Sequence, residues 1–161
     1  MGLKISAGIL LYRERAGELE VLLAHPGGPY YAHKDAGDWS IPKGEPANSD
    51  LDLEAVARRE FAEETGHSVG PDPLISLGTV VQLNGKTVYA WAARGDLDPD
   101  SAHSNNFELE WPPRSGRRQS FPEIDKVAWF TTAAARIKLK AAQISLLERL
   151  EALLDSGQDG N

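Results

Sequence analysis

The sequence contains no cysteine, and its positive charges are outnumbered by its negative ones. The missing cysteine excludes disulfide bonds, thiolate zinc sites and cysteine nucleophiles, so any metal must be held by oxygen or imidazole ligands. Seventeen Lys and Arg against 24 Asp and Glu give a net charge of −7. Because nucleic-acid binders normally carry a basic face, we expect no extended nucleic acid as a partner. An acidic protein that handles an anionic substrate needs a cation as mediator.

Long apolar runs are also missing. The N-terminal run over residues 5–12 is too short to cross a membrane, and it lacks the basic start and cleavage site of a secretory signal. Met1, Gly2 and Ser6 satisfy the short myristoylation pattern, but that pattern is loose and a strand start is favoured. We therefore expect a cytoplasmic protein without a membrane partner.

The chain has 161 residues, of which 41% are hydrophobic and 25% charged, as is usual for a globular protein. This length fits one domain with a sizeable core. Neither an internal repeat nor a linker is visible. We predict one α/β domain over residues 3–154, followed by a flexible tail over 155–161.

Apolar patterning and turn residues predict a series of strands. The expected strands cover residues 3–13, 18–24, 39–41, 74–83, 86–94, 107–111 and 126–130. Residues 15–17 form a polar turn between the first two, Pro42 stops the third, and Asn84-Gly85 is a hairpin signal. The expected loops cover residues 25–29, 96–106 and an arginine-rich segment, 112–122.

Two helical regions are expected. Asp50 and Asp52 are both good N-caps for a helix that runs to about Thr65, and Gly66 stands at the C′ position. Residues 133–154 hold one or two further helices.

The first helix changes character along one face. At about 100° per residue, Glu60, Glu63 and Glu64 fall within one arc of roughly 100°. Leu53 and Val56 lie on the same arc one and two turns earlier. The face therefore begins apolar, docked on the sheet, and ends acidic.

The acidic end of this face is unfavourable by itself. Like charges three and four residues apart repel each other, and acids are disfavoured at the negative C-terminal end of a helix. A cation above the carboxylates removes both problems, and a hydrated all-carboxylate site suits Mg²⁺ or Mn²⁺. The alternative is a solvated acidic face, the usual interpretation of a charge run.

The segment from Gly44 to Gly66 resembles the Nudix box, G-x5-E-x7-R-E-U-x-E-E-x-G-U, in which U is a bulky apolar residue. The matching residues are Gly44, Arg59, Glu60, Phe61, Glu63, Glu64 and Gly66. Residues 7–10 (AGIL) and 39–44 (WSIPKG) resemble the family's flanking segments. Residues 107–119 (FELEWPPRSGRRQ), 121–123 (FPE) and 128–130 (AWF) are similar to a bacterial subgroup of predicted nucleoside-triphosphate pyrophosphohydrolases. The resemblance covers about residues 3–153 and implies the Nudix fold, an α/β/α sandwich with a mixed central sheet.

Two departures from the box stand out. The spacing from Gly44 to Arg59 is one residue longer than the pattern, and the first glutamate is missing. Its position falls on Asp50 when counted forward and on Leu51 when counted back. In the family this glutamate is thought mainly to support the box, so its loss affects geometry around the ligands more than metal binding itself. His67 replaces the last apolar residue.

The resemblance assigns roles to the matched residues. Glu60, Glu63 and Glu64, helped by the Gly44 carbonyl, would bind Mg²⁺, with Mn²⁺ as a possible substitute. Arg59 would hold the glutamates in place; as a plain surface salt bridge it would contribute little. A catalytic base outside the box is common in the family. Glu123 is our candidate, and a surface acid at a loop end is the equal alternative.

Several residues are candidate substrate contacts. Lys43 can reach a phosphate oxygen, and Arg114, Arg117 and Arg118 can clamp phosphates bidentately. Tyr31, Phe107 or Trp111 can stack on a base. A solvated lysine, an exposed arginine loop and ordinary core aromatics explain the same residues equally well. His25, His33 and His103 are expected in loops without a catalytic part.

The sequence thus predicts Mg²⁺-dependent hydrolysis of a pyrophosphate bond in a nucleoside triphosphate, a dinucleoside polyphosphate or a related nucleoside-diphosphate derivative. A first alternative is a module on the same fold that binds a nucleotide or a protein without hydrolysis. A second is a structural or interaction protein whose acidic helix is merely solvated. Either a monomer or a homodimer is compatible with the sequence.

Overall fold

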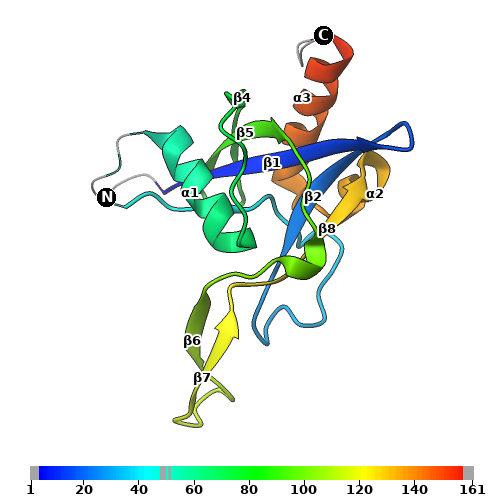
Figure 1. Ribbon diagram of the computed structural model, residues 1–161. Helices are drawn as coiled ribbons and strands as arrows, with labels where there is room; N and C mark the ends of the chain where they lie inside the picture. The colour runs from blue at the N-terminus through cyan, green and yellow to red at the C-terminus, as the bar shows by residue number, and fades with distance from the viewer. Residues whose placement is uncertain (1–3, 48–49, 51, 158–161) are drawn as a thin grey trace.

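A mixed sheet forms the centre of the computed structural model, which describes residues 4–47, 50 and 52–157 (Figure 1). Its strands run in the order β4-β5-β1-β2-β8, and the short β3 pairs with β1. The strands β1 and β5 are parallel, and the other pairs are antiparallel. Their bounds are β1 Ile5–Arg15, β2 Glu18–Pro26, β3 Lys43–Gly44, β4 Ile75–Val81, β5 Thr87–Arg94 and β8 Ile124–Thr131.

Helices cover both faces of this sheet. Helix α1 (Leu53–Thr65) lies on one face, and α2 (Thr132–Lys138) and α3 (Ile144–Asp155) lie on the other. Between these two, residues Ala141–Gln143 form a 3-10 turn. This arrangement confirms the expected α/β/α sandwich. Within the described ranges, no helix has the length and apolar character that a membrane span requires.

The strand β1 explains why two helical layers are needed. Its side chains alternate between the two faces, and both sets are buried. Ala7, Ile9 and Leu11 pack in the cluster that contains α1, whereas Leu10 and Tyr12 pack in the cluster that contains α2 and α3. A strand buried on both sides requires apolar cover on each face.

The predicted turns are confirmed. Ala16 and Gly17 have φ angles of 53° and 81° between β1 and β2, and Gly85 has a φ angle of 86° between β4 and β5. Two left-handed residues are what the two-residue loop between β1 and β2 demands, whereas Gly85 alone is left-handed in the longer loop over residues 82–86. Residues 1–3 lie outside the described residues, so Met1 and Gly2 of the myristoylation pattern do too, whereas Ser6 belongs to β1, in line with the favoured strand start.

A second, two-stranded sheet projects from the body as a hairpin (Figure 1). It consists of β6 (Asn106–Glu110) and β7 (Arg118–Pro122). The prediction of a loop over 112–122 was therefore wrong at its C-terminal end. Most of β7 is exposed and polar, so it lacks the apolar alternation that marks a half-buried strand.

The expected strand at 39–41 was also wrong. Trp39 and Ser40 form only isolated bridges, to Leu139 and Ala24, and the strand begins after Pro42. The backbone N–H of Ile41 donates to Gln143 Oε1 at 2.9 Å. This N–H group is therefore bound to a side chain and not to a neighbouring strand.

The remaining boundaries differ by small amounts. The polar loop at 96–106 contains a 3-10 turn, Pro99–Ser101, and ends in β6. Asp155 is the last residue of α3 rather than part of a tail, and residues 158–161 lie outside the described residues.

Candidate active site

Helix α1 is fixed at both ends and along one side. Asp52 caps it, because its Oδ1 accepts hydrogen bonds from the backbone N–H groups of Glu54 (3.0 Å) and Ala55 (3.4 Å). Gly66, with a φ angle of 77°, closes it in the left-handed conformation. Phe61 is buried against the sheet. The acidic residues of the last two turns therefore have a defined position.

Gly44 brings the β3 backbone against α1. Ala7 and Gly8 of β1 pair with Gly44 and Lys43. A Cβ atom at Gly44 would lie 1.8 Å from Glu60 Oε1, so only glycine leaves room for this carboxyl group. Gly8 is more strictly constrained, because its Cβ would lie 2.5 Å from the backbone carbonyl oxygen of Pro42, which cannot rotate away as a side chain can. The glycine of the box thus makes room for one of the three glutamates.

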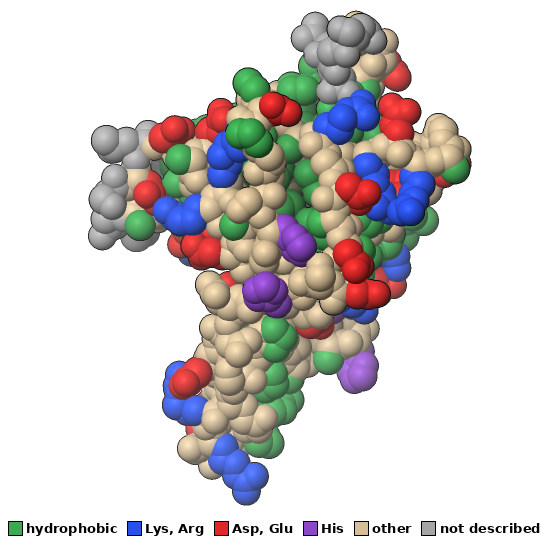
Figure 2. Space-filling model, viewed as in Figure 1, with side chains coloured by type: hydrophobic (Ala, Val, Ile, Leu, Met, Phe, Trp, Pro, Cys, Tyr) green, Lys and Arg blue, Asp and Glu red, His purple; other side chains and the backbone are tan. Residues whose placement is uncertain are grey.

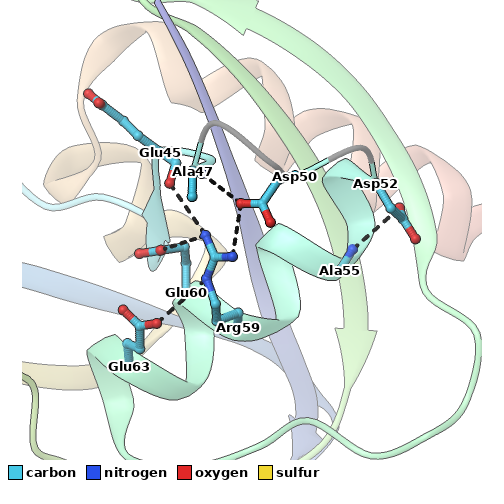
Figure 3. A network of polar contacts seen from close by, with 8 residues as sticks. All are labelled: Glu45, Ala47, Asp50, Asp52, Ala55, Arg59, Glu60 and Glu63. Carbon is cyan, nitrogen blue, oxygen red and sulfur yellow. Dashed lines mark hydrogen bonds and ion pairs between the residues drawn. The ribbon is translucent and has the colours of Figure 1, made fainter.

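Arg59 links the acids of this region (Figure 3). Its Nη1 lies 2.9 Å from Asp50 Oδ2, its Nη2 lies 3.4 Å from Glu60 Oε2, and its Nε lies 3.6 Å from Glu63 Oε2. Asp50 also accepts a hydrogen bond from the backbone N–H of Ala47, which together with Arg59 lowers its pKa. One guanidinium group therefore positions two candidate metal ligands and is itself anchored by Asp50.

Glu64 lies in the least solvated position of the three glutamates. Burial raises its pKa to about 8, and the charges of Glu60 and Glu123 act in the same direction. The backbone N–H of Lys43, 3.2 Å from Glu64 Oε1, partly opposes this. Burial also raises the pKa of Glu60, and the charge of Glu63 adds to the effect. Mutual repulsion of this kind is what a bound cation would relieve.

A cleft of about 240 Å³ opens beside Glu64. Glu123, at the junction of β7 and β8, lies on its wall and is held by two backbone hydrogen bonds, one to Gly27 and one to Asn105. Burial lowers the pKa of Lys43, and repulsion from Lys86 and Lys140 adds to this effect. The polar and charged residues that line the cleft are Asp38, Ser40, Lys43, Glu64, Glu123 and Lys140.

The donors at this site fit a hard divalent cation. They are carboxylate oxygens together with the backbone beside Gly44, the ligands that Mg²⁺ and Mn²⁺ prefer. Within residues 4–47, 50 and 52–157, no three His, Asp or Glu side chains are gathered closely enough to hold a metal as they stand. Instead, Arg59 bridges Glu60 and Glu63. The fit therefore rests on donor chemistry and on the close approach of Gly44 to Glu60.

The other predicted substrate residues lie on the hairpin and the loop beside it. Arg114, Arg117 and Arg118 are exposed on the β6–β7 hairpin, and Arg118 pairs with Glu108 at 3.1 Å. Figure 2 shows Lys and Arg side chains at the outer end of this hairpin and hydrophobic ones along one side. None of the three arginines is among the described residues that line the cleft.

Aromatic side chains join this hairpin to the loop after β2. Tyr30, which is 57% exposed, packs edge-on against Trp111 with a centroid distance of 5.2 Å. Phe107 lies against Gly28. Tyr31 is exposed, and Lys34 lies 5.9 Å from its ring. The structure thus supplies an aromatic surface between the β6–β7 hairpin and the loop after β2, and none of these rings is among the described residues that line the cleft.

His25 is not a loop residue, contrary to the expectation. It belongs to β2 and is buried, with Nδ1 2.8 Å from Asp125 Oδ1 and Nε2 2.7 Å from the Lys34 carbonyl oxygen. A buried ring with both nitrogens engaged in this way has a structural role. His33 and His103 lie in loops as expected.

Two site residues were missed from the sequence. Asp50 was considered as a cap and as a substitute for the missing glutamate, but not as the partner of Arg59. Lys140 lines the cleft although it lies far from the box in sequence. Its only signal is its place between two helical segments, which is too general to identify a site.

Comparison with known proteins decides the family. A model of the NUDIX domain matches residues 2–150. This chain belongs to the Nudix family. An uncharacterized 17.7 kDa protein of Enterobacteria phage T4, in the e-segB intergenic region, is 40% identical over 125 residues, which cover 77% of this chain and 80% of that protein. Membership of the Nudix family supports hydrolysis of a nucleotide pyrophosphate in general terms.

Solved structures agree on the Nudix fold. The NUDIX domain of Shewanella oneidensis NrtR, complexed with ADP ribose, has a TM-score of 0.66 at 17% identity, covering 96% of this chain and 90% of that one. A binary complex of a C. elegans Ap4A hydrolase has a TM-score of 0.64 at 24% identity, covering 95% and 98%. At these identities the likeness concerns the fold alone.

Proposed function

We propose that this Nudix protein hydrolyses a pyrophosphate bond in a nucleoside triphosphate, a dinucleoside polyphosphate or a related nucleoside-diphosphate derivative, with Mg²⁺ or Mn²⁺ as the metal. The observation that carries this proposal is the meeting of Glu64, Glu123 and Lys43 in one cleft next to the Gly44–Glu60 contact. At about 240 Å³ the cleft is smaller than pockets that enclose whole ligands, roughly 300–1,000 Å³. It suits the phosphate part of a nucleotide, with the nucleoside outside.

Each residue then has a defined task. Glu60, Glu63, Glu64 and the Gly44 carbonyl would hold the metal, which when bound neutralises phosphate charge and acidifies water. Arg59 keeps two of these carboxylates in place, and Lys43 binds a phosphate oxygen.

The hydrolysis consumes one water. Its oxygen forms a bond to one phosphorus as the bond from that phosphorus to the bridging oxygen breaks. Glu123, as general base, accepts the proton of the water, and the bridging oxygen leaves with the other phosphate group. The position of Glu123 on the wall of the cleft that Glu64 lines supports this assignment.

The nucleoside would lie toward the hairpin. Tyr31 and Trp111 would stack on the base, and Arg114, Arg117 and Arg118 would contact phosphates outside the cleft. The aromatic contact between Tyr30 and Trp111 and the exposed arginines near Trp111 on the same hairpin support this placement.

A panel of nucleoside triphosphates, dinucleoside polyphosphates and nucleoside-diphosphate derivatives, assayed with Mg²⁺ and with Mn²⁺, tests the proposal. Product identification locates the bond that is cut. Glu63→Gln and Glu64→Gln should each lower turnover by about 100-fold or more. Glu54→Gln, which changes the same charge on the same helix away from the site, should retain activity. No turnover across the panel by a folded protein would overturn the proposal.

A binding module without turnover is the second candidate, since the first glutamate of the box is missing and the NUDIX domain of NrtR is complexed with ADP ribose. Saturable nucleotide binding without any product would favour this module. A solvated acidic helix in a structural protein predicts instead no stabilisation by Mg²⁺ plus nucleotide.

We further propose a cytoplasmic monomer or homodimer without an extended nucleic acid as partner. Light scattering after size-exclusion chromatography measures the oligomeric state. A gel-shift assay with duplex DNA at physiological salt should show no complex.

A further inference from the structure

The lysines of this chain divide clearly by burial and pairing. Four lysines are half-buried: Lys43, Lys86, Lys138 and Lys140. Lys86 pairs with Glu45 at 2.7 Å, and Lys138 pairs with Asp35. Within the described part of the chain, the side chains of Lys43 and Lys140 have no hydrogen bond or ion pair. These two are also the lysines that line the cleft.

Leaving these two cations unpaired is costly in a protein of net charge −7, where acids are plentiful. Glu64 and Glu45 attract the partly buried ammonium group of Lys43 through space, but neither makes an ion pair with it, so no direct partner replaces its lost hydration. Lys140 is also close enough to Lys43 for the two charges to repel each other. Asp38 lines the same cleft without pairing with either. An anionic ligand between the two lysines would compensate both groups.

The backbone of Lys140 is fastened to the segment that leads to Lys43. The N–H of Lys140 donates to the Trp39 carbonyl oxygen at 2.9 Å, and its carbonyl oxygen accepts from the N–H of Gln143 at 2.9 Å. The fully buried Gln143 side chain donates to Ser40 Oγ and accepts from the Ile41 N–H. The two lysines therefore come from segments of the chain that are locked together.

We infer that Lys140 is a substrate-binding residue that, together with Lys43, holds the phosphate oxygens of a diphosphate group in this cleft. The inference rests on the proposed function. It adds to the proposed substrate-binding residues one that lies outside the Nudix box, between α2 and α3 on the other face of the sheet from α1. A diphosphate suits two ammonium groups on one cleft better than a single phosphate, because each ammonium can take an oxygen of a different phosphoryl group.

Binding of methylenediphosphonate, a diphosphate analogue that cannot be hydrolysed, tests this inference by calorimetry on the full chain with Mg²⁺. Lys140→Gln should weaken binding roughly tenfold, and Lys140→Arg should restore most of it. Lys138→Gln is the matched control, since it removes the same charge two residues away and outside the cleft. Binding of Mg²⁺ alone should be unchanged in Lys140→Gln, and melting confirms that each variant is folded.

The outcomes separate this inference from the proposed function. If the wild type fails to bind the analogue, or if Lys140→Gln binds it as tightly as the wild type, Lys140 has no such role. Turnover with an unchanged KM in Lys140→Gln also overturns the inference and leaves the hydrolase proposal standing. Lys140-dependent binding without turnover of any substrate overturns the hydrolase proposal and supports this site.

Discussion

Glu64 couples the chemistry of the site to the stability of the protein. Its pKa is about 8 in the fold against an ordinary value of 4.5, because burial disfavours the charged form. Between these two pH values the folded chain binds a proton that the unfolded chain has lost. The free energy of unfolding of the metal-free protein should therefore fall as the pH rises from about 4.5 to about 8.

Replacing Glu64 by glutamine tests this coupling. The amide still accepts the hydrogen bond from Lys43 but cannot ionise. Above pH 8 the metal-free variant should be more stable than the metal-free wild type, by on the order of a few kcal/mol. Chemical denaturation at pH 5 and pH 8.5 measures the difference. An equal pH slope in both proteins would contradict the assignment of the raised pKa to Glu64.

A substitution at Gly44 should change the geometry of the site much more than the stability of the protein. In Gly44→Ala, the new Cβ would collide with the Glu60 carboxyl group, which can swing away because it ends a flexible side chain. Stability should change by about 1 kcal/mol or less, whereas turnover should fall about 10- to 100-fold because Glu60 leaves its place. Steady-state kinetics and thermal melting give the two quantities. Gly70→Ala, with nothing within 4 Å of its Cβ, should match the wild type in both.

At the scale of single elements, two aspartates close together in sequence serve different purposes. Asp52 caps α1, and Asp50 anchors Arg59. Asp52→Ala should lower the free energy of unfolding by about 1 kcal/mol with little loss of activity. Asp50→Ala should lower activity clearly and change the free energy of unfolding little. A half-exposed ion pair stabilises little, but Arg59 loses its anchor. Urea denaturation and steady-state kinetics on both variants measure the two effects. Equal losses of activity in both variants would contradict the separate roles of Asp52 and Asp50.

The elements show which kinds of pattern can be predicted from sequence. The caps of α1 and the Gly85 turn were predictable because local backbone geometry demands particular residue types. The strand β7 was not, since its residues are polar and its pairing with β6 depends on a partner rather than on its own pattern. The segment at 39–41 failed for a similar reason: Gln143, over 100 positions away, takes the N–H of Ile41.

The whole molecule assembles its cleft from five separate parts of the chain, one of which is the end of β2 at Ala24 and Pro26. The other four are the segment through Lys43, the end of α1, the junction before β8 and the turn at Lys140. The Nudix box identified the segment through Lys43 and the end of α1, because it is continuous in sequence. Glu123 was a candidate beside the alternative of a surface acid, and Lys140 was missed. Which distant residues meet is decided by the sheet order, and a single sequence does not specify that.

The charge balance of the whole molecule gives the last prediction. The protein has a net charge of −7 and three glutamates at one end of α1. Repulsion between these negative charges lowers the stability of the metal-free protein. Mg²⁺ at ten times its dissociation constant should add about 1.4 kcal/mol of stability, which corresponds to roughly 3–6 °C in Tm for a chain of this size. Because screening alone also relieves repulsion, NaCl at the same ionic strength is the control, and it should give a clearly smaller shift in Tm.

Glu64→Gln should lose most of the Mg²⁺-specific part of this shift in Tm, whereas Glu54→Gln should keep it. Equal shifts with Mg²⁺ and NaCl would mean that the glutamates of α1 bind no ion and form a solvated face.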